Sequence, residues 1–225
     1  MIREYEIIET GDGSHTLKLA GEKITFHSDR GAIQESQHVF VKTGFDYFVQ
    51  KSLSGEAVAV FEVGFGTGLN ALLTAIAATQ KHKEVLYYSI DRYPLPAEIY
   101  TKLNYPDLLK VPVLYKAIMQ AGWEELLPVT PFFSLQKINE DLSSYAFDRQ
   151  FDVIYFDTFA PDNQEEMWTE TIYVKMYDAL HPGGLLVTYC SKGNVRRALV
   201  QAGFMVEKLP GPPGKREIIR ANKPG

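Results

Sequence analysis

The pattern of apolar and polar positions changes after residue 56, where apolar runs begin to alternate with segments of helical spacing. Such alternation predicts a mostly parallel sheet that is covered by helices on both faces. The predicted strands are 57–63, 84–91, 132–138, 151–157, 184–190, 203–209 and 216–220, and the predicted helices are 69–79, 165–180 and 193–202.

Two parts of this pattern are irregular. The last two predicted strands are separated only by Pro210–Gly214, which predicts a final antiparallel hairpin. The segment 92–131 is too long for a simple crossover, so we expect helices near 96–103 and 113–121 within it. The pattern gives this insertion no function.

The chain before residue 55 follows another pattern. Short alternating segments from Tyr5 to Phe26 flank the turn Gly11–Gly13, which predicts a hairpin. Mostly helical spacing from Ile33 to Leu53 predicts a helix. We therefore expect an N-terminal appendage, residues 1–54, packed on a main domain, residues 55–225.

Composition narrows the class of protein. With 225 residues and 45% hydrophobic content, the chain is long enough for a full core. Its one cysteine, Cys190, excludes an internal disulfide, and the five histidines lack metal-ligand spacing. No signal segment and no long apolar stretch is seen. We expect a cytoplasmic protein without a metal site or a membrane partner.

Charge is distributed unevenly along the chain. The net charge of -5 argues against a nucleic-acid partner, but from Lys192 onward eight basic and two acidic residues give +6 and leave -11 elsewhere. This indicates a basic face on an acidic body. A merely solvated C-terminal surface fits the charge equally well.

An acid and three glycines stand at alternate positions at the end of the first strand of the main domain. They are Glu62, Gly64, Gly66 and Gly68. Glycines let a ligand approach the backbone amides, which suit a carboxylate together with the helix dipole. A dinucleotide fingerprint needs a third glycine where this chain has Leu69, which disfavours a nicotinamide oxidoreductase. A tight turn without a ligand needs fewer glycines.

The run from Glu62 to Asn70 resembles the first motif of the Rossmann-like S-adenosylmethionine-dependent methyltransferases, and so does an antiparallel last strand. This resemblance implies a class I α/β fold with a mostly parallel seven-stranded sheet. It also implies S-adenosyl-L-methionine as cofactor. The cofactor-binding residues expected in the motif are Glu62, Gly64, Gly66, Gly68 and Asn70.

Further acids stand where predicted strands end, which is the ligand-binding edge of an open parallel sheet. Asp91 is placed to accept ribose hydroxyls, and Asp141 to accept a hydrogen bond from an adenine amino group. Asp157 follows the apolar run Val153–Phe156 and is expected beside the methyl donor. For each acid a helix cap or a loop residue is the simpler alternative.

Asp157 carries the predicted chemistry. An alkyl amine must lose a proton before methylation, which costs up to roughly 4.6 kcal/mol at pH 7 for a pKa of about 10.4. An ionised aspartate recruits the ammonium group, orients the nitrogen and helps to remove the proton. We therefore expect Asp157 to be the catalytic residue.

Several segments together resemble the methyltransferase domain of the MnmC-type tRNA modification enzymes, which form 5-methylaminomethyl-2-thiouridine at the wobble position. The resemblance covers nearly the whole chain. The matching segments are GAIQESQHVF (31–40), FEVGFGTGLN (61–70), DTFAPDNQEEMW (157–168) and GPPGKREIIR (211–220).

The resemblance implies methyl transfer to the amine of an aminomethyl uridine in tRNA, with Asp157 contacting the amine. It also implies substrate contacts by Phe159 at the extruded base and by Lys215 and Arg216 at phosphates. Two features depart from the family. Thr158 replaces a common glycine and is expected to narrow the acceptor pocket, and no flavin oxidase follows, so a separate enzyme must supply the aminomethyl group.

Two other functions remain open at this point. One is a methyltransferase of a small-molecule or protein amine. The other is a noncatalytic tRNA-binding module with a degenerate cofactor cleft, which the complete set of acids disfavours.

Overall fold

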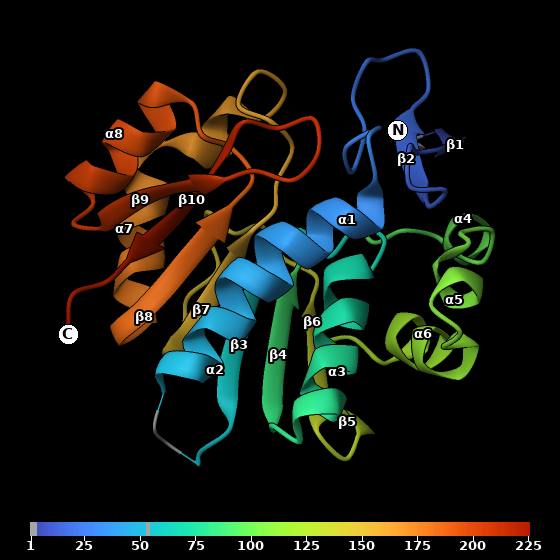
Figure 1. Cartoon of the computed structure of the whole chain (residues 1–225), viewed down its shortest axis with the longest axis horizontal. Helices are drawn as coiled ribbons and strands as arrows, with labels where there is room; N and C mark the ends of the chain where they lie inside the picture. The colour runs from blue at the N-terminus through green and yellow to red at the C-terminus, as the bar shows by residue number, and fades with distance from the viewer. Residues whose placement is uncertain (1–3, 53–54) are drawn as a thin grey trace.

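The computed structural model describes residues 4–52 and 55–225. An eight-stranded sheet forms its centre, in the order β5-β6-β4-β3-β7-β8-β10-β9, beside a separate two-stranded hairpin, β1-β2 (Figure 1). The strands are β1 (Tyr5–Glu9), β2 (His15–Leu19), β3 (Val58–Val63), β4 (Val85–Ile90), β5 (Leu127–Thr130), β6 (Phe133–Ile138), β7 (Phe151–Phe156), β8 (Leu180–Thr188), β9 (Met205–Pro210) and β10 (Glu217–Asn222).

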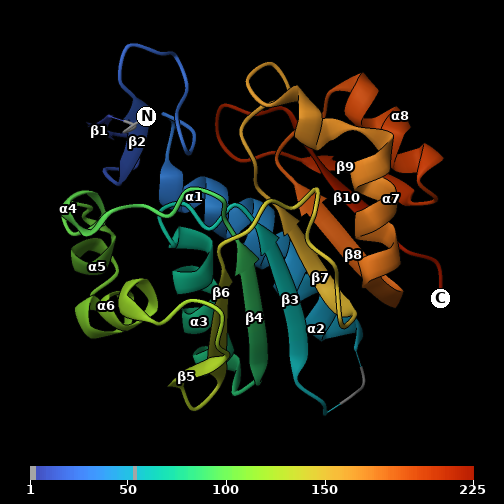
Figure 2. The same cartoon turned by 180° about the vertical axis from the view of Figure 1, so that it is seen from behind.

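Helices cover both faces of the sheet, as the alternating pattern predicts. In Figure 1 the N-terminal helices and α3 lie in front of the sheet, and Figure 2 shows α7 and α8 on the opposite face. The helices are α1 (Ala32–Ser36), the π-helical η1 (Gln37–Asp46), α2 (Tyr47–Lys51), α3 (Leu69–Lys81), α4 (Ala97–Tyr100), α5 (Tyr105–Leu108), α6 (Pro112–Gln120), the 3₁₀ turn η2 (Glu165–Trp168), α7 (Glu170–Ala179) and α8 (Gly193–Gln201).

Two hydrophobic cores result from the period of two along the strands. On β3, Val58 and Val60 pack in the core under η1 and α3, whereas Phe61 and Val63 pack in the core under α7 and α8. Strands that are buried on both faces read as continuous apolar runs, which is why these strands were readily predicted.

The predicted fold class is confirmed, with one more strand than the seven expected. β3, β4, β6, β7 and β8 run parallel, and β10 is antiparallel to both β8 and β9. The additional strand, β5, pairs antiparallel with β6 at the edge of the sheet. It has only four residues and contains Pro128, so its pattern is weak and its place is an edge.

Two helical regions also differ from prediction. The helix expected over 165–180 is divided at Thr169, whose extended backbone ends η2 and whose hydroxyl accepts from the Ile172 amide to begin α7. In the insertion, α5 lies between the two helices expected there, α4 and α6. The predicted N-terminal helix is present as α1, η1 and α2, and Leu53 lies outside the described residues.

Candidate active site

A cavity of about 910 Å³ opens at the carboxyl ends of β3, β4, β6 and β7. This volume is ample for a nucleoside-sized ligand. One wall comes from the hairpin and the segment after it, which lie above the strand ends in Figure 1. The cavity is lined by seven of the predicted site residues, namely Gly64, Gly66, Asn70, Asp91, Asp141, Asp157 and Phe159.

The glycine loop has the backbone shape that its sequence predicts. Gly64 has φ 94° and Gly66 has φ 48°, both in the left-handed region that favours glycine. A Cβ on Gly64 would overlap the carbonyl oxygen of Asp157. Gly68, at the start of α3, lies outside the cavity, and a Cβ there would meet the Met119 sulfur at 2.6 Å. Gly64 therefore lets the end of β3 approach the residue after β7, and Gly68 lets the start of α3 approach α6.

Asp91 and Asp141 line one end of the cavity. Asp91 accepts hydrogen bonds from the amides of Gly66 (2.9 Å) and Tyr93 (2.7 Å), so it fixes the glycine loop. Asp141 accepts from the amide and hydroxyl of Ser143 and pairs with Arg92 at 2.6 Å. Hydrogen bonds from Ser143 hold the pKa of Asp141 below its ordinary value.

Glu62 does not line the cavity. The period of two along β3 puts it on the same face as Val58 and Val60, under α3, where it is fully buried. One carboxyl oxygen accepts from Ser89 (2.7 Å), and burial raises the pKa of Glu62 to about 8. Direct contact of Glu62 with a cofactor therefore remains a prediction. The contact that the structure shows joins Glu62 on β3 to Ser89 on β4.

Asp157 lies at the other end of the cavity, after β7. The Asn70 amide donates to its carboxyl group at 2.8 Å, which joins the start of α3 to the end of β7. Burial raises the pKa of Asp157 to about 8, against the opposing effect of this hydrogen bond. The carboxyl group of the free protein therefore titrates much closer to neutral pH than an ordinary aspartate does.

An aromatic wall stands next to Asp157. The Phe159 ring meets the Phe26 ring edge to face, with centroids 5.2 Å apart. Thr158 is buried and also lines the cavity, with its hydroxyl donating to the carbonyl of Phe159. His27 lies in the same wall, in contact with the Thr67 hydroxyl at 3.0 Å, and burial lowers its pKa to about 4.

The two predicted phosphate-binding residues differ in environment. The Lys215 ammonium pairs with Glu35 at 2.6 Å and lies outside the cavity lining. Arg216 is exposed, and its side chain has no hydrogen bond or ion pair within residues 4–52 and 55–225. Of the other basic residues after position 191, Arg196 and Arg197 are exposed likewise.

Sequence reasoning missed three groups of the site. His27 and Phe26 reach the cavity from the segment after the hairpin, where no motif marks them. Glu35 lies in the segment that resembles the family, but its partner is 180 residues away. Tyr189, after β8, donates to the carbonyl of Thr158 at 2.7 Å. Only Glu35 had a signal in the sequence.

The cavity fits the cofactor that the glycine motif implies. Leu69 and Asn70 at the start of α3 line it, and no side chain caps that helix end, so first-turn amides are available to a carboxylate. Asp91 and Asp141 offer carboxylate acceptors to the hydroxyls and amino groups of a nucleoside.

The chain is similar to several known proteins. Residues 133–224 match a family model described as an S-adenosyl-L-methionine-dependent methyltransferase. The tRNA 5-methylaminomethyl-2-thiouridine biosynthesis bifunctional protein MnmC of Cupriavidus metallidurans is 30% identical over 210 residues, which are 87% of this chain and 31% of that protein. The MnmC protein of Pseudomonas fluorescens is 31% identical over 212 residues, with the same coverage. The chain thus spans about a third of the curated relatives.

Solved structures agree on the fold. MnmC2 from Aquifex aeolicus aligns with a TM-score of 0.78 and 22% identity, over 100% of this chain and 73% of that chain. Spermidine synthase from Thermotoga maritima aligns with a TM-score of 0.63 and 18% identity, over 100% of this chain and 70% of that chain.

Two features are absent from the described residues, 4–52 and 55–225. No helix there has the length and apolar character needed to cross a membrane. No group of three or more histidine, cysteine, aspartate or glutamate side chains there is arranged to hold a metal ion.

The resemblance and the cofactor class predicted from the sequence are confirmed by the matched family and relatives. The chain has the fold of the S-adenosyl-L-methionine-dependent methyltransferases, and 87% of it matches about a third of each MnmC relative.

Proposed function

We propose that this chain methylates the amine of 5-aminomethyl-2-thiouridine at the wobble position of tRNA, giving the 5-methylaminomethyl product. The printed names of the similar MnmC proteins support the product and the tRNA. The observation that carries the chemistry is the partly buried carboxyl group of Asp157, which lines the cavity next to the glycine loop and has a pKa raised to about 8.

The cofactor end of the cavity contains Asp91, Asp141 and the start of α3. In the proposal Asp91 accepts the ribose hydroxyls, Asp141 accepts from the adenine amino group, and the α3 amides bind the carboxylate. S-adenosyl-L-methionine supplies an electrophilic methyl group on its sulfonium. The roles proposed for Gly64 and Gly66 are steric, because a side chain at either position would crowd the loop.

Asp157 is suited to accept a proton from the acceptor amine. Proton transfer from an amine of pKa about 10.4 to a carboxylate of pKa about 3.9 costs about 9 kcal/mol. Transfer to Asp157, whose pKa is about 8, lowers that cost to roughly 3 kcal/mol. When it is protonated, the carboxyl group must first release its own proton to solvent, which adds about 1.4 kcal/mol at pH 7 for a pKa of about 8.

The acceptor base would enter between Asp157 and the aromatic wall. Phe159 and Phe26 offer apolar ring surface to a uracil that has left its stack. Thr158 fills space beside them and, as the sequence predicts, would narrow the pocket on this side. The exposed Arg216, Arg196 and Arg197 would contact the phosphates outside.

The proposal places the reaction in the cytoplasm, where tRNA is modified, and requires another active site to supply the aminomethyl uridine. It assigns no metal to the reaction.

One observation favours a second candidate, methylation of a small-molecule or protein amine. The cavity lining carries seven acidic side chains against one arginine, Arg92, which attracts a cationic amine and repels phosphates. The acids are Glu4, Glu22, Asp91, Glu140, Asp141, Asp157 and Glu166.

Nucleoside mass spectrometry of cells lacking the gene tests the proposal. The 5-aminomethyl-2-thiouridine precursor should accumulate in tRNA, and the unaltered gene should restore the methylated nucleoside, whereas a gene encoding Asp157→Asn should not. Normal levels of the methylated nucleoside in the deletion strain would contradict the tRNA assignment.

A further inference from the structure

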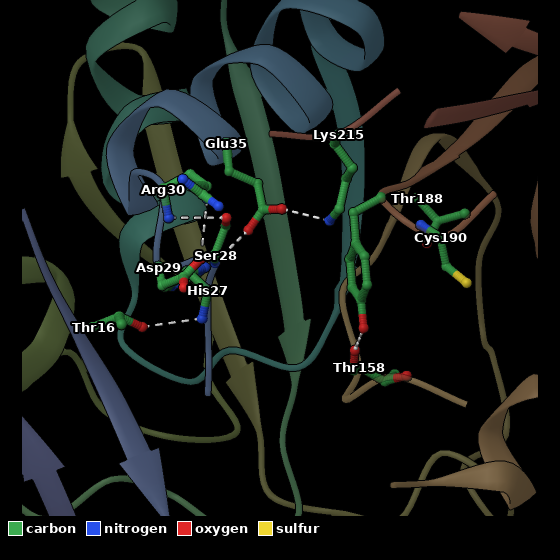
Figure 3. A network of polar contacts seen from close by, with 11 residues as sticks. Thr16, His27, Ser28, Asp29, Arg30, Glu35, Thr158, Thr188, Cys190 and Lys215 are labelled. Carbon is green, nitrogen blue, oxygen red and sulfur yellow. Dashed lines mark hydrogen bonds and ion pairs between the residues drawn. The ribbon is translucent and has the colours of Figure 1, made fainter. Parts of the chain in front are cut away.

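An ion pair joins the two ends of the chain beside the acceptor side of the cavity. Glu35 lies on α1, and Lys215 lies in the loop between β9 and β10. Their charged groups are 2.6 Å apart, and Figure 3 shows the two side chains pointing at one another from the helix and the loop. The His38 ring, which contacts the carbonyl of Pro210 at 2.8 Å, holds the same loop to the helical segment.

This pair is more buried than an ordinary surface salt bridge. The Glu35 side chain is 8% exposed and the Lys215 side chain 32%, and the second carboxyl oxygen of Glu35 accepts from the Ser28 amide at 2.8 Å. Lys208 and Glu217 form another ion pair on the same hairpin, 2.7 Å long, with side chains 46% and 31% exposed. Removal of one partner from a buried pair leaves an uncompensated charge, whereas an exposed pair is largely screened.

A contact path leads from the pair to the Asp157 segment. The Lys215 ammonium lies 4.2 Å from the centroid of the Tyr189 ring. The Tyr189 hydroxyl donates to the carbonyl of Thr158 at 2.7 Å, one residue after Asp157. Lys215 therefore packs on the residue that fixes the peptide next to Asp157.

The pair also contributes opposite charges around Asp157. The Glu35 carboxylate raises the pKa of Asp157, and the Lys215 ammonium lowers it. From the other elements, Asn70 on α3 donates to Asp157, and the hydroxyls of Tyr189 and Tyr87 and the carboxyl group of Glu62 interact with it electrostatically. Among these groups Glu35 and Lys215 form the one ion pair.

We propose that the Glu35–Lys215 ion pair is a positioning element for Asp157: it holds the Asp157–Phe159 segment in place through Tyr189 and balances two opposite charges beside that carboxyl group. The proposal rests on the methyl transfer proposed above. It also gives Lys215 a role other than phosphate binding.

Opposite substitutions test the charge balance. Glu35→Gln keeps an acceptor for the Ser28 amide but leaves Lys215 uncompensated, so the pKa of Asp157 should fall by on the order of one unit. Lys215→Met leaves Glu35 uncompensated, so that pKa should rise by a similar amount. The double variant should return it toward the original value.

The readout is the carboxyl carbon-13 shift of Asp157 during a pH titration of the ligand-free protein, alongside the pH profile of kcat/KM for methylation. Lys208→Met, in the exposed pair, is the matched control and should move neither. Shifts of equal sign in the two single variants, or none beyond the control, would overturn the charge balance.

Tyr189→Phe tests the contact path, since it keeps the ring under Lys215 and removes the hydroxyl. We expect kcat to fall roughly tenfold to a hundredfold through misplacement, with the KM for the cofactor unchanged. An unchanged kcat would overturn the claim that the Asp157–Phe159 segment is held in place through Tyr189. If even the unaltered protein fails to methylate the tRNA, the proposed function fails, while the Asp157 titration still decides the charge balance.

Discussion

Asp141 and Asp157 follow two parallel strands of one sheet and line one cavity. Their pKa values are nevertheless shifted in opposite directions. Asp141 is partly exposed and accepts from Ser143, so its pKa is low and its carboxylate stays charged. Asp157 is also only partly exposed, but desolvation of its carboxyl group raises its pKa to about 8. Position at the edge of the sheet makes both acids available to a ligand. Burial then separates a hydrogen-bond acceptor from a proton acceptor.

The same substitution at the two acids should have its largest effect at Asp157. Asp157→Asn removes the proton acceptor, and turnover should fall by about 10² to 10⁴ with the cofactor still bound. Asp141→Asn should leave kcat nearly unchanged, because that side chain lies at the other end of the cavity. Steady-state kinetics with calorimetry of cofactor binding measures both, and similar kcat losses in the two variants would remove the distinction.

The two acids with raised pKa values, Glu62 and Asp157, should also affect the stability of the ligand-free protein. The pKa values of Glu62 and Asp157 are raised to about 8 in the folded state, so folding binds protons above the unfolded pKa values. Stability from these groups is therefore full below about pH 4 and is lost as pH rises toward 8, by at most about 1.4 kcal/mol per pH unit for each group.

Urea unfolding from pH 5 to 8 measures this slope. Glu62→Gln should make the decline shallower by the share of one group, while Asp141→Asn should not. Parallel curves for the unaltered protein and Glu62→Gln would show that the Glu62 carboxyl group is not protonated on folding.

Asp91, at the cofactor end of the cavity, should contribute to binding and not to turnover. Asp91→Ala should weaken S-adenosyl-L-methionine binding by about 1.5 to 3 kcal/mol, because charge-assisted hydrogen bonds are lost. Calorimetry should show no binding of NAD to the unaltered protein. Unchanged affinity for S-adenosyl-L-methionine in the variant would place its ribose elsewhere.

The smallest predicted effect is a difference between Arg216 and Lys215 in how each contributes to the salt dependence of tRNA binding. Arg216 is exposed, so Arg216→Ala should lower the slope of log affinity for tRNA against log salt by somewhat under about one unit. Lys215→Met should change that slope little, because the ammonium group is already paired with Glu35. Equal changes in both variants would mean that the pair opens when tRNA binds.

Strands, turns and helix starts that depend on neighbouring residues alone could be predicted from the sequence. The apolar run of β3 and the glycines after it fix a strand, a turn and a helix start within 13 residues, and the structure has all three. The motif predicts that Glu62 binds the cofactor, and this stays a prediction. The period of two along β3 puts Glu62 on the face of Val58 and Val60. The alternation of residues along a strand is therefore enough to predict on which face of the sheet Glu62 lies.

The remaining features depend on contacts that no local pattern contains. The raised pKa of Asp157 results from burial by packed elements, and the partner of Lys215 is 180 residues away on α1. The strand β5 was missed because four residues with a proline carry little periodicity. Motifs located the chemistry, and tertiary packing decided the protonation and pairing of each side chain.

The central claim is that the cavity at Asp157 methylates the amine of an aminomethyl wobble uridine. The most direct measurement is methyl transfer from labelled S-adenosyl-L-methionine by the purified protein to tRNA carrying 5-aminomethyl-2-thiouridine, with nucleoside mass spectrometry of the product. The account predicts conversion to 5-methylaminomethyl-2-thiouridine by the unaltered protein and a loss of about 10² to 10⁴ with Asp157→Asn. No methylation of that tRNA, with transfer to a small amine instead, would contradict it.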